Sequence, residues 1–309
     1  MNTPLVSICC VTYNHAPFIR KCLDGFLMQQ MDFSIEILIH DDCSTDGTTE
    51  IIREYEARYP DLIFPLYEEE NQYQQGKARE IDLYNYRRAR GKYIAYCEGD
   101  DYWTDPHKLQ KQVDFMEANP EYTVCFHDYV TYSAWTREFS NENITYDNDI
   151  DVTLDLFLNG KTGIGLPLTM LFRVSAYDLN WYKHYTRYCD MMEIMHLLLV
   201  GKGRFLSFIG GQHNLHSGGI SATNPDIRRS LEYCVDVQEM WNLGKHPAIK
   251  RFYIEAYKWR IDICFKSKLY SEINKALILA LTNDFFIGLR IISYAMKKVL
   301  KNYKNIVCD

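Results

Sequence analysis

The chain has 309 residues, of which 47% are hydrophobic and 24% are charged, a composition typical of a globular protein. Its 34 Lys and Arg residues against 41 Asp and Glu residues give a net charge of −7, which argues against broad electrostatic binding of nucleic acid. The ten cysteines contain no C-x-x-C pair, and the sequence shows neither a signal peptide nor an uncharged apolar stretch of about 18 residues. We therefore expect a cytoplasmic protein with free thiols that does not span a membrane.

The first 130 residues alternate short apolar runs with amphipathic segments. The runs that predict strands are Leu5–Val11, Ile35–Ile39, Leu62–Leu66, Lys92–Cys97 and Tyr122–Phe126. Helices are predicted between them, at about 16–30, 48–59, 77–90 and 106–118. Strands separated by single helices imply right-handed crossovers, so we predict an α/β fold whose mainly parallel twisted sheet is flanked by helices.

The pattern changes to helices alone from about Pro225, and Pro247 is a predicted break between two of them. We place a domain boundary near residue 222. It divides the chain into a sheet-containing domain at 1–222 and a helical C-terminal region at 223–309, which we expect to contact a partner or a membrane.

Polar side chains follow three of the predicted strands, at the point where each strand ends. They are Thr12 and Tyr13, Asp41 and Asp42, and the segment Glu98–Asp101. Ligands of parallel sheets bind beyond the carboxyl ends of the strands. The sequence therefore predicts that these three clusters share one edge of the sheet and form a site there.

The segment Glu98–Asp101 places three carboxylates within four residues. Their mutual repulsion is unfavourable unless a cation or solvent relieves it. Oxygen ligands favour Mg²⁺ or Mn²⁺, which commonly bridge to substrate phosphates, and Gly99 permits the tight backbone that such crowding requires. A solvated acidic loop is the alternative interpretation.

A second cluster, H-D-D-C-S-T-D-G-T at 40–48, combines turn residues with two adjacent carboxylates. Ser44 and Asp46 are interpreted as caps of the following helix. Asp41 or Asp42 could instead accept a hydrogen bond from the N3–H of a uracil-type base.

Read together, the segments V-S-I-C-C-V-T-Y-N-H, D-D-C-S-T-D-G-T and E-G-D-D-Y-W-T-D-P-H-K-L resemble the family 2 glycosyltransferases of the GT-A fold, over residues 4–220. The resemblance implies a nucleotide-binding group that comprises Thr12, Tyr13, Asn14, Asp41, Asp42, Glu98, Gly99 and Asp100. It also implies that Glu98-Gly99-Asp100 stands in place of the family's D-x-D element, with Glu in the first position and Asp100 on Mn²⁺ or Mg²⁺.

The resemblance further implies an inverting reaction with a single carboxylate base. Asp190, in the segment R-Y-C-D-M-M-E, is the predicted base, and Glu193 is its substitute. An ordinary helix cap is the alternative role for Asp190. His216, in H-S-G-G-I, is predicted to complete the metal or diphosphate contacts, with Gly218 and Gly219 beside it and His213 in reserve.

Several further residues are weaker candidates. Lys77, with Arg79 after it, could meet a phosphate or merely begin a helix. The predicted acceptor or supporting residues are Asp101, Trp103, His127, Asp128, Glu193, Gly218 and Gly219. Trp103 and Trp135 could stack on a sugar or pack in the core.

The segment 285–304 carries five Lys or Arg residues and no acid, with apolar residues near helical spacing. Such a helix could lie on anionic lipid or pack on the catalytic domain. We predict a glycosyltransferase that takes a nucleotide diphosphate sugar, with UDP as the expected carrier. Its acceptor would be a glycan or a lipid-linked glycan, and no nucleic acid takes part. A nucleotidyltransferase and a non-catalytic binding module are the alternatives.

Overall fold

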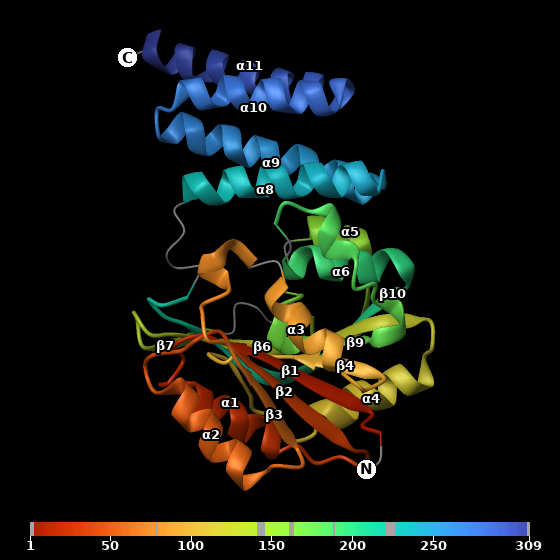
Figure 1. Cartoon of the computed structure of the whole chain (residues 1–309). Coiled ribbons are helices and arrows are strands. Elements are labelled where there is room, and N and C mark those ends of the chain that lie inside the picture. The colour runs from red at the N-terminus through yellow and green to blue at the C-terminus, as the bar shows by residue number, and fades with distance from the viewer. Residues whose placement is uncertain are drawn as a thin grey trace. The chain divides into compact units, whose positions relative to one another are not determined.

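The computed structural model describes residues 3–77, 80–140, 146–160, 164–187, 189–219 and 226–307, and the side chains of 226–227 and 300–307 are not described. The chain divides into two compact units (Figure 1). The sheet unit comprises 1–183 and 187–217, and the helical unit comprises 184–186 and 218–309. The boundary predicted near residue 222 lies in 220–225, outside the described residues, and stays a prediction.

The sheet unit alternates strands and helices as expected. Its strands are β1 (Val6–Thr12), β2 (Ile35–Asp41), β3 (Ile63–Tyr67), β4 (Tyr93–Tyr96), β5 (Tyr102–Trp103), β6 (Tyr122–Ser133), β7 (Glu138–Ser140), β8 (Ile150–Val152), β9 (Leu171–Arg173) and β10 (Lys202–Leu215). Its helices are α1 (Ile19–Leu27), α2 (Thr48–Arg58), α3 (Ile81–Arg88), α4 (Lys108–Ala118), α5 (Leu154–Asn159) and α6 (Asp190–Val200), and a π-helical turn occupies Tyr73–Lys77.

These strands form one mixed sheet in the order β3-β2-β1-β4-β9-β6-β10-β5, with β7 on β6 and β8 on β10. The four longer pairings, β1 with β2, β1 with β4, β2 with β3 and β6 with β10, are parallel. The antiparallel pairings span only two or three residues each. The prediction of a mainly parallel, helix-flanked α/β sheet is confirmed.

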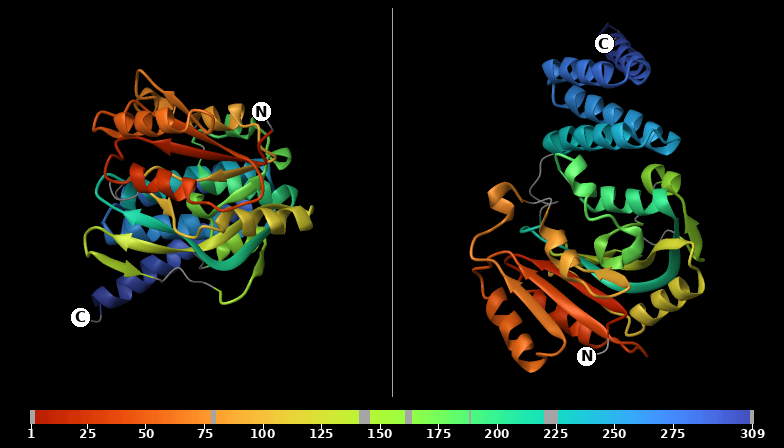
Figure 2. Two further views of the ribbon diagram at one scale, coloured as in Figure 1. Left: turned by 90° about the horizontal axis from the view of Figure 1, so that it is seen from below. Right: turned by 45° about the vertical axis from the view of Figure 1, so that its right-hand side comes forward.

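The register of the parallel strands brings the predicted polar clusters to one edge. Thr12 at the end of β1 lies opposite Asp41 at the end of β2. The Gly99 N–H donates to the Val11 carbonyl at 2.9 Å, so the loop after β4 also reaches this edge. Helices α1 and α2 lie on one side of β1 and β2, and α3 lies on the other (Figures 1 and 2). The three polar clusters therefore lie next to one another at this edge of the sheet.

Helix α1 is three residues shorter at each end than the predicted 16–30, and two further elements depart from the predicted bounds. Strand β6 continues to Ser133 instead of ending at Phe126, because its second half pairs with β10 and then turns back through the short β7. Helix α3 begins at Ile81 instead of near Lys77, because the chain first forms the π-helical turn, in which Gly76 adopts φ of 78°. Residues 78–79, and with them Arg79, lie outside the described part of the chain.

The core beneath the acidic loop contains a buried lysine. Trp103 is 1% exposed, and its Nε1–H donates to the Leu168 carbonyl at 2.9 Å. The Lys108 Nζ lies 3.7 Å from the centre of the Trp103 ring, and burial lowers the pKa of Lys108 to about 7. Trp103 therefore offers no ring face to a sugar, and its contribution to the site is to anchor the chain that follows the acidic loop.

The helical unit contains α8 (Asp226–Leu243), α9 (Pro247–Lys266), α10 (Tyr270–Asn283) and α11 (Phe285–Val307), which stack in chain order (Figure 1). Pro247 starts α9, where the missing N–H costs little, so the predicted break is confirmed. A search of the described helices finds none with both the length and the apolar character needed to cross a membrane.

Candidate active site

Asp100 is the centre of a small cluster of imidazole groups. Its Oδ2 lies 3.0 Å from His216 Nε2 and 3.7 Å from His15 Nε2. Burial opposes ionisation of Asp100, but the hydrogen bond with His216 and the nearby charges of His15 and His216 outweigh it, so the pKa of Asp100 lies below its ordinary value. The structure thus brings together Asp100 and His216, as the resemblance implied, and adds His15, which the sequence analysis did not select.

The end of β10 holds the acidic loop in place. The Asn214 backbone N–H donates to the buried Asp101 carboxylate at 2.8 Å, and the Asn214 side chain donates to the Asp100 carbonyl at 2.6 Å. Because His216 follows two residues later, these bonds bring its ring to Asp100. The pKa of Asp101 lies well above its ordinary value, because burial and the charge of Asp100 both disfavour the ionised form.

Gly99 is required by close packing against β1. A Cβ at this position would lie 2.6 Å from Thr12 Oγ1 and 3.1 Å from His15 Nδ1. Thr12 Oγ1 and His15 Nδ1 are buried and have no hydrogen-bond partner within the described residues. The end of β1, the loop that follows it and the acidic loop therefore meet without space for a larger residue at position 99.

The donor atoms at this point suit a divalent cation. The imidazole and carboxylate donors of His15, Asp100 and His216 lie within 4.8 Å of one another, as do those of Glu98, Asp100 and Asp101. Carboxylate oxygens suit Mg²⁺ and Mn²⁺, and imidazole nitrogen is a further common ligand of transition metals. The residues present fit the predicted Mn²⁺ or Mg²⁺, and Asp100 belongs to both groups.

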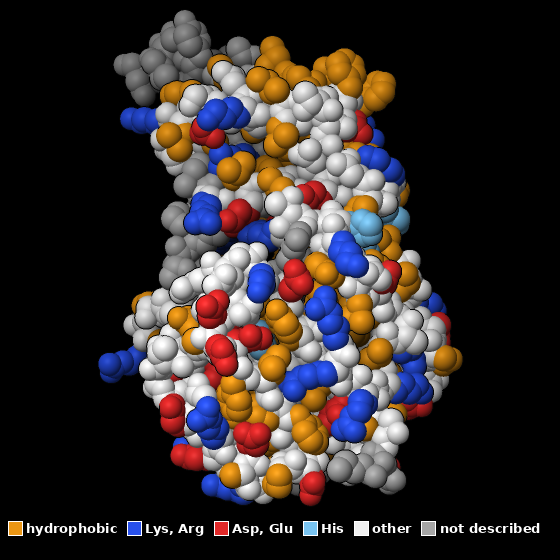
Figure 3. Space-filling model, in the orientation of Figure 1, with side chains coloured by type: hydrophobic (Ala, Val, Ile, Leu, Met, Phe, Trp, Pro, Cys, Tyr) orange, Lys and Arg blue, Asp and Glu red, His pale blue; other side chains and the backbone are white. Residues whose placement is uncertain are grey.

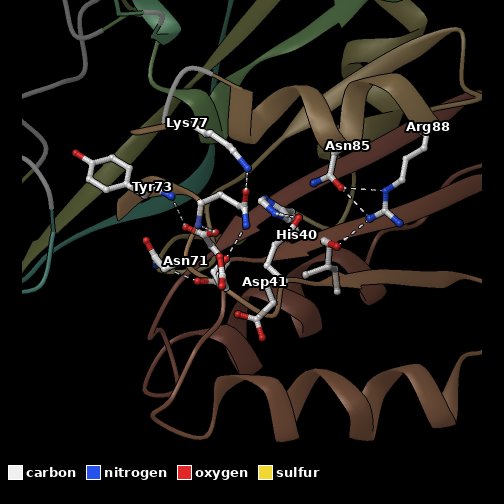
Figure 4. Close-up of polar contacts among 12 residues, drawn as sticks. His40, Asp41, Asn71, Tyr73, Lys77, Asn85 and Arg88 are labelled. Atoms are coloured by element: carbon white, nitrogen blue, oxygen red, sulfur yellow. Dashed lines mark hydrogen bonds and ion pairs between the residues drawn. The ribbon is translucent and has the colours of Figure 1, made fainter. Parts of the chain in front are cut away.

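Asp41 and Asp42 organise the loops beyond β2 (Figure 4). The Asp42 carboxylate accepts backbone N–H groups from Gln72 at 2.6 Å and Tyr73 at 3.1 Å. Asp41 accepts from the Ser44 N–H at 3.2 Å and from the Thr49 hydroxyl. Each carboxylate oxygen has a second lone pair, so these bonds leave capacity for a ligand. The role of either residue in nucleotide binding stays a prediction.

The remaining predicted nucleotide residues surround this loop. Asn14, at φ of 56°, donates its backbone N–H to Ser44 Oγ at 2.9 Å and accepts the Thr45 N–H at 2.8 Å, so it joins the loops after β1 and β2. Tyr13 is 38% exposed beside it. Lys77 is exposed and donates to the Gln72 side chain at 2.8 Å, which holds it near the Asp42 loop (Figure 4).

Asp190 and Glu193 both lie in the first turn of α6, but their environments differ. Asp190 is the first residue of the helix, is partly exposed and accepts the Met191 N–H at 2.8 Å. Burial raises the pKa of Asp190, and contacts with Met191, Cys189 and Arg187 partly offset this rise. Glu193 is buried and accepts the Tyr86 hydroxyl at 3.0 Å.

The charge of Asp190 acts on two other carboxyl groups, those of Glu98 and Asp82. The pKa of Glu98 is raised well above its ordinary value, first by loss of hydration and then by the charges of Asp100, Asp101, Asp190 and Asp82. Glu98 is thus affected both by its neighbours in the acidic loop and by Asp190. Asp82, which the sequence analysis missed, accepts the Tyr96 hydroxyl at 2.6 Å, and its pKa is raised to about 6 by burial, an effect that Asp190 increases.

The predicted acceptor residues divide into buried and exposed groups. His127 and Asp128 are buried in β6, and burial lowers the pKa of His127 to about 3 while it raises that of Asp128. Trp135, by contrast, is exposed in the turn between β6 and β7. Its neighbour Ala134 donates its N–H to the Leu215 carbonyl at 2.9 Å, directly before His216.

Gly218 and Gly219 follow Ser217 in the loop after β10, and the remainder of this loop, 220–225, lies outside the described residues. His213, the reserve candidate, is partly buried, and burial lowers its pKa while Asp100 opposes the change. The histidine contacts that the structure describes at the Asp100 carboxylate come from His216 and His15 and not from His213.

The model of glycosyl transferase family 2 matches residues 7–180, and the chain belongs to this family. An uncharacterized protein of Mycobacterium tuberculosis is 37% identical over 188 residues, which cover 58% of this chain and 52% of the relative. TuaG of Bacillus subtilis, named for glycosyl transfer in teichuronic acid biosynthesis, is 33% identical over 159 residues, covering 49% of this chain and 59% of TuaG. The chain thus spans about half the length of the curated relatives it matches.

Solved structures share the fold at low sequence identity. Staphylococcus aureus TarS 1–349 in complex with UDP-GlcNAc has a TM-score of 0.66 at 16% identity, covering 95% of this chain and 84% of that one. The mannosyltransferase PcManGT of Pyrobaculum calidifontis, in complex with GDP-Man and Mn²⁺, has a TM-score of 0.53 at 16% identity, covering 96% and 88%. The sheet unit thus has the predicted GT-A architecture.

Proposed function

We propose that this protein is an inverting, metal-assisted glycosyltransferase that moves a hexosyl group from a UDP-sugar to a hydroxyl of a glycan or lipid-linked glycan. The observation that carries the proposal is the cluster in which Asp100 lies 3.0 Å from His216 and 3.7 Å from His15, with donor atoms that suit a divalent cation. The second element is Asp190, a partly exposed carboxylate at the start of α6 whose charge acts on Glu98 of the same acidic loop. An inverting transfer needs these two elements on opposite sides of one reacting carbon.

The nucleotide end of the site is assigned to the loops after β1 and β2. Tyr13 would stack on the base and Asp41 or Asp42 would accept the base N3–H, while Thr12 and Asn14 shape the same surface. Glu98 and Gly99 would border the ribose. Lys77, at the end of the π-helical turn, carries a positive charge that suits a phosphate.

The diphosphate end is assigned to Asp100 with His216. When bound there, Mn²⁺ or Mg²⁺ would offset the negative charge that grows on the departing diphosphate, which lowers the energy of the transition state more than that of the ground state. Asp100 suits this role because its lowered pKa keeps it ionised. The Asn214 contacts hold the acidic loop in place, which reduces the rearrangement needed for binding.

Asp190 is assigned as the base. Its carboxylate would take the proton of the acceptor hydroxyl as that oxygen bonds to the anomeric carbon, while the bond between this carbon and the diphosphate oxygen breaks and its electron pair leaves with UDP. Attack opposite the leaving group inverts the configuration. A raised pKa makes an ionised Asp190 a stronger base than an ordinary aspartate. Trp135, with an exposed ring near the end of β10, is assigned to the acceptor side.

The chemistry of the cysteines supports a reducing, cytoplasmic location. No disulfide joins any two of the nine described cysteines, and seven of them are buried. A role in polysaccharide synthesis follows from the names of relatives such as TuaG and is part of the proposal.

A donor screen tests the proposal. Thermal stability of the full chain is measured with a panel of nucleotide sugars, with and without Mn²⁺, and UDP release is measured in parallel. We expect a UDP-sugar to raise the melting temperature in a Mn²⁺-dependent manner and Asp100→Asn to remove that dependence. A binding module would show the thermal shift without UDP release. Release of pyrophosphate in place of UDP would indicate a nucleotidyltransferase. Either result would refute the proposal.

A further inference from the structure

Helix α11 presents hydrophobic residues on two opposite sides. Ile287, Ile291 and Ala295 are buried against the helical unit, which accounts for one side. On the other side, Phe285, Phe286, Leu289, Met296 and Val299 are exposed, from 46% for Leu289 to 75% for Phe286. Packing within the unit therefore explains only half of the apolar residues of this helix.

The exposed residues form one continuous stripe. At 100° per residue, Phe285, Leu289 and Met296 fall within about 40° of one another around the helix axis, with Val299 and Phe286 on either side. The stripe extends over about 21 Å, which is 14 residues at 1.5 Å each. Ile278 of α10 is also exposed, and hydrophobic side chains gather over α10 and α11 in Figure 3.

The charges beside the stripe have one sign. Arg290 and Lys297 are exposed next to Phe286 on the helix surface, whereas Lys298 pairs with Asp262 of α9 at 2.8 Å. The sequence of α11 adds Lys301 and Lys304 and contains no Asp or Glu, although the whole chain has a net charge of −7. The helix that carries the exposed stripe is therefore positively charged, although the chain as a whole is negatively charged.

We propose that the exposed face of α11 binds the surface of an anionic lipid bilayer, with the phenylalanines in the interface and Arg290 and Lys297 on the headgroups. Amphipathic helices that combine Phe and Leu on one face with flanking cations bind such surfaces. A second copy of the chain is a poorer fit. The stripe has cations along its rim, and the sequence of α11 contains no Asp or Glu with which a symmetric copy could pair. This surface is independent of the sugar-transfer site and would hold the enzyme beside a lipid-linked acceptor.

Vesicle sedimentation of the full chain tests this inference. Vesicles of phosphatidylcholine alone are compared with vesicles that also contain phosphatidylglycerol. We expect binding to the anionic vesicles that weakens as salt is raised. Replacing Phe286 and Leu289 by Ser should lower the partition coefficient at least about tenfold. Replacing Arg290 and Lys297 by Gln should lower it about 30-fold on anionic vesicles only.

Leu243→Ser is the matched control, since Leu243 on α8 is 45% exposed and Leu289 is 46% exposed. It should bind vesicles as the parent does, and circular dichroism verifies that each variant is folded. Absence of vesicle binding by the parent, or equal loss in Leu243→Ser, overturns the inference. So does concentration-dependent dimerisation, measured by light scattering, that the Phe286 and Leu289 substitutions abolish while vesicle binding remains. Asp100→Asn should bind vesicles normally, which separates this result from a failure of the proposed activity.

Discussion

The assignment of the base can be tested by exchanging each carboxylate of the first turn of α6 for its amide. Asp190→Asn removes the only proposed proton acceptor, and loss of general-base catalysis typically costs about 10²- to 10⁴-fold in rate. We expect kcat for UDP release to fall within that range. The affinity for UDP should change little, because Asp190 is assigned to the acceptor hydroxyl and not to the nucleotide.

Glu193→Gln should have a much smaller effect, for reasons that the structure supplies. Burial, and then the charge of Asp82, raise the pKa of Glu193 well above its ordinary value, which favours the protonated carboxyl group over the carboxylate. Glutamine has nearly the same shape as a protonated glutamic acid and can still accept the Tyr86 hydroxyl, now 3.0 Å from Glu193 Oε1. We expect kcat to stay within about threefold of the parent value, because Glu193 is buried and its ionised form, which is the form that accepts a proton, is disfavoured.

The assay measures UDP release at saturating donor and Mn²⁺, with melting temperature and UDP affinity recorded for every variant. Glu193→Ala serves as a control for loss of the Tyr86 contact, and should lower stability by about 1–3 kcal/mol because a buried hydroxyl loses its partner. If Glu193→Gln abolishes release while Asp190→Asn retains it in a folded protein, the base is Glu193 and the reasoning from burial is wrong.

Three further predictions concern the neighbourhood of the site. Gly99→Ala should destabilise the sheet unit by roughly 1–3 kcal/mol in urea unfolding, because its Cβ would lie 2.6 Å from Thr12 Oγ1; an unchanged midpoint would contradict the packing described. Asp42→Ala leaves the N–H groups of Gln72 and Tyr73 without their acceptor, so unfolding should require about 2 kcal/mol less and UDP should bind more weakly in titration calorimetry. The pKa of Lys108 is about 7 in the folded protein and 10.5 in an ordinary lysine, which stands for the unfolded chain. Between these two pH values the unfolded chain binds one proton more at Lys108 than the folded protein does. The free energy of unfolding therefore rises with pH, by at most about 1.4 kcal/mol per pH unit. Lys108→Met should remove that part of the pH dependence, and an identical slope in both proteins would exclude a neutral buried lysine.

Local pattern was sufficient to predict the sheet and one side of the site. Period and composition mark a buried strand within a few residues, and parallel strands necessarily place their carboxyl ends at one edge. The sequence alone is therefore sufficient to group Thr12, Asp41 and Asp100. Strand β6 was underestimated because the residues after Phe126 are polar and aromatic, and their strand conformation depends on pairing with β10 and β7.

The sequence contains no comparable local pattern that predicts contacts between distant parts of the chain. His15 and His216 are separated by 201 positions, and they meet at Asp100 only because Asn214 ties the end of β10 to the acidic loop. The sequence likewise does not predict the orientation of an indole ring. Trp103 is buried in the core, where its ring contacts Lys108, and is not available to a sugar. Periodicity in the sequence indicates which face of a helix or strand is apolar. The partners of each side chain depend on how all the elements pack together. That packing brings the separate polar clusters together at the candidate site.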